Sequence, residues 1–128
     1  MTFQFKKVET KNVRSDDRIS ITTSNSIGIT QTFYKDQSIA NFKYVVLYFD
    51  ETVKALGILF TNDENEKFKF TIIHSKKGYG ASIVVRSFFK TYKIDPKIYH
   101  NKYVWQPVDQ EGIGKLYVIN LKERQINT

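Results

Sequence analysis

The chain has 128 residues, a formal net charge of +7 and no cysteine. This length suits a single domain, and the lack of cysteine excludes disulfide bonds and thiolate metal sites. No segment has the apolar character of a membrane span or a secretory leader, so we expect a cytoplasmic protein that does not enter membranes. Ten Phe, eight Tyr and many β-branched residues favour strands over long helices.

The pattern of apolar residues divides the chain into three parts, residues 1–17, 18–61 and 62–128. The first part begins with an alternation of Phe3 and Phe5 and then becomes polar and basic. This predicts an edge strand followed by an N-terminal basic arm.

The second part begins with a predicted hairpin from Arg18 to Thr30. Ile19 and Ile21 alternate with polar residues, and Ser24–Ser26 supplies a turn in which asparagine tolerates left-handed backbone. The two strands of this hairpin are therefore expected to bury one face each.

A short helix and a second hairpin are expected next. The helix begins at Thr32, which can cap it, and ends at Ile39. Tyr44–Phe49 is apolar on both faces, which is typical of a central strand, and Ala55–Phe60 returns beside it.

The third part follows a polar run at Asn62–Glu66 and has the same order of elements. Phe68, Phe70 and Ile72 alternate as an inward-facing strand, and a loop at Lys76–Gly80 leads to a partner strand. A second helix is predicted to be capped by Ser87 and to end before Pro96, because the residue before proline avoids helical backbone. We expect Phe49, Phe60, Phe68 and Phe70 to be buried, and Tyr79, Tyr92, Tyr99 and Trp105 to be exposed.

The two helices belong to an internal repeat. Ile29–Ile39 aligns without gaps on Val84–Ile94 at an offset of 55, with Phe33 on Phe88 and Lys35 on Lys90. The sequence therefore predicts a mainly β protein with two short helices, in which a tandem β-β-α-β-β repeat forms one compact, barrel-like domain.

This order of elements, with Ile27–Lys35 leading to Ile39 and then to Tyr44–Asp50, resembles the AbrB/SpoVT family of swapped-hairpin DNA-binding proteins. In that family two such units interlock as a homodimer, and basic residues of the hairpin and helix contact DNA. The resemblance implies a tandem pseudo-dimer within one chain over residues 18–121, either monomeric or further paired as a homodimer. The chain departs from the family at three positions. The family's glycine-arginine pair is replaced by Asn25-Ser26 and Gly80-Ala81, and its proline by Thr30 and Val85. Its paired arginines are matched only by Lys35-Asp36 and Lys90-Thr91.

Catalytic chemistry has little support in the sequence. His74 and His100 have no spacing that places both on one metal ion. Adjacent carboxylates such as Asp50-Glu51 fall in turns, and no phosphate-binding or dinucleotide-binding motif occurs. We therefore expect a protein that is not an enzyme and that uses no cofactor and no metal.

Basic residues interleaved with aromatic residues indicate nucleic-acid binding. Residues 82–101 carry four basic side chains against Asp95 alone, and such an excess attracts polyanions. The candidate contacts are Arg14, Arg18, Lys76, Lys77, Arg86, Lys90, Lys93, Lys97, Tyr92 and Tyr99. We expect a nucleic-acid-binding protein that prefers DNA to RNA. Because lysines bind phosphates rather than base edges, its contacts should be mainly to the phosphate backbone.

Two other interpretations of the charged surface stay open. The basic residues are also compatible with an ordinary solvated surface. The chain is also compatible with a protein-interaction or inhibitor module, such as a phage or mobile-element accessory factor, whose strand edges pair with a protein partner.

Overall fold

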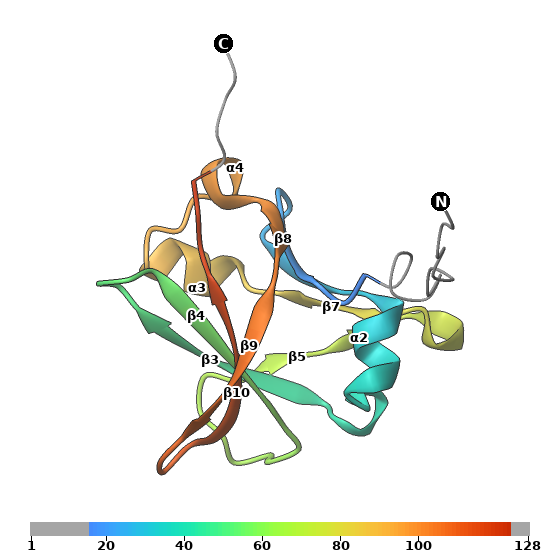
Figure 1. The fold of residues 1–128 in the computed structure, drawn as a ribbon. Helices are drawn as coiled ribbons and strands as arrows, with labels where there is room; N and C mark the ends of the chain where they lie inside the picture. The colour runs from blue at the N-terminus through green and yellow to red at the C-terminus, as the bar shows by residue number, and fades with distance from the viewer. Residues whose placement is uncertain (1–15, 124–128) are drawn as a thin grey trace, which may run out of the picture.

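The computed structural model describes residues 16–123, and it confirms a mainly β fold, built of two five-stranded sheets and short helices (Figure 1). The predicted strand and basic arm of residues 1–15, with Arg14, lie outside the described residues. None of the helices between residues 16 and 123 is long and apolar enough to cross a lipid bilayer.

The first sheet contains five short strands in the order β6-β7-β2-β1-β8, all antiparallel to their neighbours. Their bounds are β1 Ile19–Thr22, β2 Ser26–Ile29, β6 Ile73–His74, β7 Ala81–Val84 and β8 Asn101–Tyr103. The hairpin predicted from Arg18 to Thr30 is confirmed as β1 and β2, with Asn25 in the left-handed region at its turn (φ 62°).

The second sheet has the order β5-β3-β4-β10-β9 and is also antiparallel. Its strands are β3 Tyr44–Asp50, β4 Ala55–Thr61, β5 Phe70–Thr71, β9 Trp105–Gln110 and β10 Gly114–Asn120. β3 lies between two neighbours, as its apolar faces predicted, although β5 pairs only with its first two residues, Tyr44 and Val45. The remainder of β3, Val46–Asp50, has no strand partner on that edge among the described residues.

The two halves of the chain meet at the centre of each sheet. In the first sheet β2 pairs with β7, with Ser26 opposite Val84 and Ile29 opposite Ala81. At the repeat offset of 55, Ser26 corresponds to Ala81 and Ile29 to Val84, so each of these two pairs is the repeat equivalent of the other. The contact between β2 and β7 therefore has an approximate two-fold symmetry. In the second sheet β4 of the first half pairs with β10 of the second.

At two places within residues 16–123 a single residue joins a strand of one sheet to a strand of the other. β5 and β6 are consecutive, separated by Ile72, and belong to different sheets; β8 and β9 are likewise separated by Val104. The strand pairing nevertheless leaves two separate sheets over residues 16–123, so the predicted barrel is not confirmed.

One apolar cluster, drawn from both sheets and from the helices, forms the core. The largest fully buried side chains include Phe33, Phe89, Ile27, Ile83 and Leu56. Burial of each such side chain contributes about 1.5 to 3 kcal/mol, so the interior strand faces and the two helices depend on the same core for stability. The predicted burial of Phe60 is confirmed, whereas Phe49 and Phe70 are half-buried.

Residues 16–123 contain three short α-helices rather than two: α2 Gln31–Asp36, α3 Arg86–Thr91 and α4 Pro96–Tyr99. The same residues contain two 3-10 turns, η1 Ile39–Asn41 and η2 Lys76–Gly78. α4 is not expected from the sequence, in which Pro96 is predicted only to end the preceding helix. Proline also suits the first turn of a new helix, where its fixed φ is favourable, and Asp95 caps α4 by accepting from the Lys97 N–H at 2.9 Å.

Both predicted helix caps were wrong. The Oγ1 of Thr30, not of Thr32, caps α2 by accepting from the Phe33 N–H at 3.2 Å. α3 has no side-chain cap, since Val85 occupies the cap position and Ser87 lies within the first turn. The physical reason is the same in both halves: a single residue, Thr30 or Val85, separates each helix from its strand, so the cap position lies two residues before the predicted one.

The prediction that Phe68 faces inward was also wrong. Its side chain is 89% exposed and its backbone is left-handed (φ 62°), while Ile72 of the same alternation is buried. Strand pairing begins only at Phe70, where β5 meets β3, so nothing holds Phe68 in an extended conformation.

Gly80 should be the most sensitive glycine of the fold. Its φ is 129°, and a Cβ there would lie 2.4 Å from the carbonyl oxygen of Ile29, where β7 approaches β2. We expect Gly80→Ala to lower the free energy of unfolding by about 3 kcal/mol or more, because it adds a backbone clash to an unfavourable φ. Urea unfolding at neutral pH measures this loss.

Gly78→Ala is the matched control in the same loop, because its φ is 70° and no atom lies within 4 Å of the added Cβ. It should cost only about 1 kcal/mol. Equal losses for the two variants would contradict the close approach of β7 to β2.

Candidate functional site

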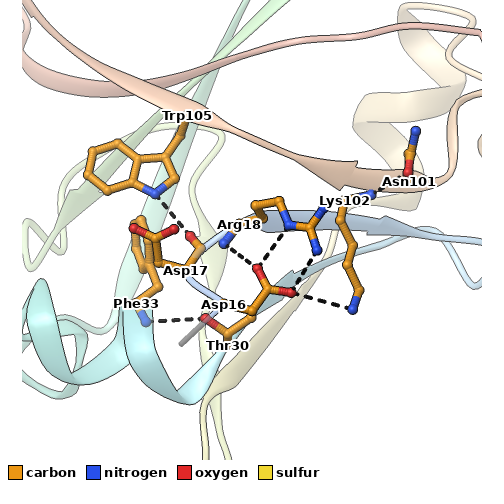
Figure 2. Close-up of polar contacts among 8 residues, drawn as sticks. All are labelled: Asp16, Asp17, Arg18, Thr30, Phe33, Asn101, Lys102 and Trp105. Carbon is orange, nitrogen blue, oxygen red and sulfur yellow. Dashed lines mark hydrogen bonds and ion pairs between the residues drawn. The ribbon is translucent and has the colours of Figure 1, made fainter. Parts of the chain in front are cut away.

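The first predicted contact, Arg18, is already paired with a carboxylate. Its Nε lies 3.0 Å from Asp16 Oδ1 and its Nη2 lies 3.2 Å from Asp16 Oδ2 (Figure 2). Lys102 Nζ also lies 3.4 Å from Asp16 Oδ2. The hydrogen bonds from Arg18 lower the pKa of Asp16 to about 2. Arg18 is exposed, but its charge is largely balanced by Asp16.

Trp105 lies beside this ion pair and is not available for stacking on a base. Its indole N–H donates to the Asp17 carbonyl at 2.9 Å (Figure 2). Its ring packs edge-on against Phe33 and Tyr117, with centroids 5.3 and 5.0 Å apart. The predicted exposure of Trp105 is therefore wrong, because the ring is half-buried on the core.

Lys76 and Lys77 form a second, separate basic group. Both are exposed in η2, which contacts α2. η2 precedes β7 and α3 follows it, so the length of β7 separates these lysines from α3 (Figure 1). Tyr79 beside them is 63% exposed, as predicted.

The largest basic group lies on and after α3. Arg86 and Lys90 are four residues apart and so share one face of the helix, and Lys93 follows the helix; we call these three residues the α3 stripe. All three are exposed, and none forms an ion pair with a residue between 16 and 123. α3 contains no acidic residue, whereas α2 ends in Lys35-Asp36. Lys97 lies nearby in sequence on α4 and is also exposed.

The two predicted tyrosines differ in position. Tyr92 is 38% exposed and packs one side of its ring against Phe88 and Phe49, with centroids 4.8 and 5.4 Å away. Tyr99 is only 7% exposed, so the prediction that it is exposed is wrong. It is buried because the unpredicted helix α4 turns it toward the core, where its carbonyl accepts from the Tyr103 hydroxyl.

A groove that the sequence did not predict lies beside α3. Its walls are Val46–Tyr48 of β3, the loop Glu66–Phe68 and the Ser87, Phe88, Thr91 and Tyr92 side of α3, with Phe70 also lining it. We call it the β3–α3 groove; its volume is about 650 Å³. The one sequence signal for it was Phe68 between two lysines after a polar run, which is an unusual setting for a buried ring.

His74 has a structural position. Its Nε2 lies 2.8 Å from the Phe42 carbonyl, which can only accept, so Nε2 carries the proton. Its Nδ1 lies 2.8 Å from the Tyr34 hydroxyl of α2. Over residues 16–123, no group of three or more His, Asp and Glu side chains converges to hold a metal ion.

No protein-family model, no curated protein and no solved structure matches this chain. The site must therefore be interpreted from its own geometry.

The ion pair at Asp16 should make stability depend on pH. Because the folded-state pKa is near 2 and the ordinary value is 3.8, Asp16 favours the folded state above about pH 4, and this contribution is lost as pH falls toward 2. Urea unfolding should show Asp16→Asn less stable than the original protein at pH 7, with the difference shrinking below pH 4.

Asp109→Asn is the control, because Asp109 is exposed and forms no ion pair within the described part of the chain. It should leave the pH profile unchanged. A constant difference for Asp16→Asn from pH 7 to pH 2.5 would show that the loss does not arise from ionisation.

Proposed function

We propose that this protein is a non-enzymatic nucleic-acid-binding protein, with DNA as the preferred ligand, that contacts phosphates through the α3 stripe. The observation that carries the proposal is the state of Arg86, Lys90 and Lys93: all are exposed, and none is paired with a carboxylate within residues 16–123. Unpaired cations clustered on and directly after one helix attract a polyanion and release its counterions on binding.

The arrangement of the strands supports the same proposal. Two hairpin-helix-hairpin units in one chain meet through β2–β7 and β4–β10, which agrees with the resemblance to the swapped-hairpin family. In this proposal the second unit binds the nucleic acid, because its helix keeps its positive charge. Arg18 contributes less than the sequence indicated, since Asp16 and its hydrogen bonds oppose it. Lys97 lies close to the stripe in sequence, whereas Lys76 and Lys77 form a separate basic group at the other end of β7.

Reversing charge in the stripe should weaken binding. We expect Lys90→Glu with Lys93→Glu to lower affinity for a short DNA at low salt and to reduce the slope of log affinity against log salt by about 2, or about 1 for each lost phosphate contact. Fluorescence anisotropy over a series of salt concentrations measures both quantities.

The internal repeat offers a matched control. Lys35 of α2 occupies the position of Lys90 of α3, in the last turn of a six-residue helix. Lys35→Glu changes the net charge as much as Lys90→Glu does, but it should have the smaller effect on binding. If the wild-type protein binds neither DNA nor RNA at low salt, or if the two variants lose affinity equally, the proposal fails.

Strand addition by a protein partner is a second candidate function. It is favoured by the edge of β3, which has no strand partner from Val46 to Asp50 within the described residues. Exposed edges pair readily with extended segments of other chains. Purification from cells separates the two candidates: we expect bound nucleic acid, detected by its absorbance at about 260 nm and removed by high salt, and a stoichiometric protein partner would favour strand addition instead.

A further inference from the structure

Phe68 has an exposure and a backbone conformation that are both unfavourable for the folded chain. Its side chain is 89% exposed, and its left-handed backbone is unfavourable for a bulky residue. The loop around it is nevertheless held in place. Lys69 Nζ donates to the carbonyls of Glu64 and Glu66, at 3.0 and 3.2 Å, and lies 5.2 Å from the ring centroid of Tyr44. The ring of Phe68 is thus presented on a fixed loop at the wall of the β3–α3 groove.

A row of aromatic rings also lines the groove. Phe70 and Phe88 lie with ring centroids 6.5 Å apart, and Tyr92 continues the row 4.8 Å from Phe88. The unpaired edge of β3 at Val46–Tyr48 adds backbone N–H and C=O groups, which can bond the edge of a flat polar ring. At about 650 Å³ the groove has the size of a small-molecule site.

Positive charge lies on the same helix, outside the groove. Ser87 and Thr91, which are exposed, line the groove at its lip, whereas Arg86, Lys90 and Lys93 of the α3 stripe do not line it. Two charged residues, Glu66 and Lys67, line the groove itself, and their opposite charges cancel. The excess of positive charge therefore comes from α3. A ligand that carries flat rings on one side and a row of negative charges on the other is complementary to this arrangement.

A peptide strand fits the groove less well. Only three residues of β3, Val46–Tyr48, face it, which is shorter than a typical strand of five or six residues. A peptide would also make no use of the basic residues beyond the lip unless it were acidic. A duplex would reach the stripe, but its paired and stacked bases could not enter the groove.

We propose that the β3–α3 groove binds unpaired bases of single-stranded nucleic acid, which stack on Phe68 and Tyr92 while the α3 stripe contacts their phosphates. This inference rests on the proposed function and narrows it from nucleic acid in general to single strands. Stacking of one base on an exposed aromatic ring contributes about 1 to 3 kcal/mol, which corresponds to roughly 5-fold to 150-fold in affinity.

The test compares a labelled oligothymidylate of about 12 nucleotides, within the usual site size of single-strand binders, with a duplex of the same length. The original protein should bind the single strand more tightly at low salt. Phe68→Ala should weaken binding of the single strand by at least 5-fold and leave binding of the duplex unchanged. Its thermal unfolding should match that of the original protein, because the ring it removes is 89% exposed.

Tyr79→Ala is the matched control, since Tyr79 follows η2 directly, is 63% exposed and does not line the groove. It should bind oligothymidylate as the original protein does. If Phe68→Ala has no effect while the Lys90 and Lys93 variant binds poorly, the groove inference fails and the proposed function survives. If neither the single strand nor the duplex binds, both fail. If Phe68→Ala releases a co-purified protein and oligothymidylate does not bind, the groove is a peptide site.

Discussion

The pairing of β2 with β7 is the contact on which the rest of the molecule depends. Each strand has only four residues, yet their register buries Ile27 directly opposite Ile83, both with no exposed surface. The approach is so close that only glycine fits at position 80. Because α2 follows β2 and α3 follows β7, the antiparallel pairing sends the two helices to opposite ends of the sheet (Figure 1). It also places η2, which precedes β7, beside α2.

This topology explains why the basic residues do not form one surface. Lys76 and Lys77 are close to α3 in sequence but are separated from it by the full length of β7. The helices of the two halves also differ in their caps and in their charges. α2 is capped by Thr30 and carries a balancing Asp36, whereas α3 lacks a side-chain cap and a balancing acid. A missing cap costs about 1 kcal/mol, and the packing of Phe88 and Phe89 compensates by holding α3 on the core.

Local periodicity was enough to predict β1 to β4 and the mainly β fold, because alternation of Ile19 with Ile21, or the two apolar faces of β3, follows from burial alone. It did not predict that the strand of Phe68, Phe70 and Ile72 would divide into β5 and β6, which belong to different sheets. Local periodicity could not predict which distant strands pair with each other. The sequence could not show that β5 would stop at Phe70 and leave Phe68 in solvent, nor that a helix begun by Pro96 would bury Tyr99. It also could not show that Asp16 would neutralise Arg18, because neighbouring charges pair only when the backbone turns them together.

Phe68 departs from its predicted strand position and lines the β3–α3 groove instead. A strand-period phenylalanine that leaves the core loses the apolar burial that would have stabilised the fold, and a left-handed backbone adds a further cost. The rest of the site is held by contacts that already stabilise the protein: Lys69 holds the loop, and Phe88 and Tyr92 pack against Phe49. A ligand would therefore meet rings that are already placed, so that little ordering free energy opposes binding. Phe68 is the feature of this fold that its stability explains least and that a stacking ligand explains best.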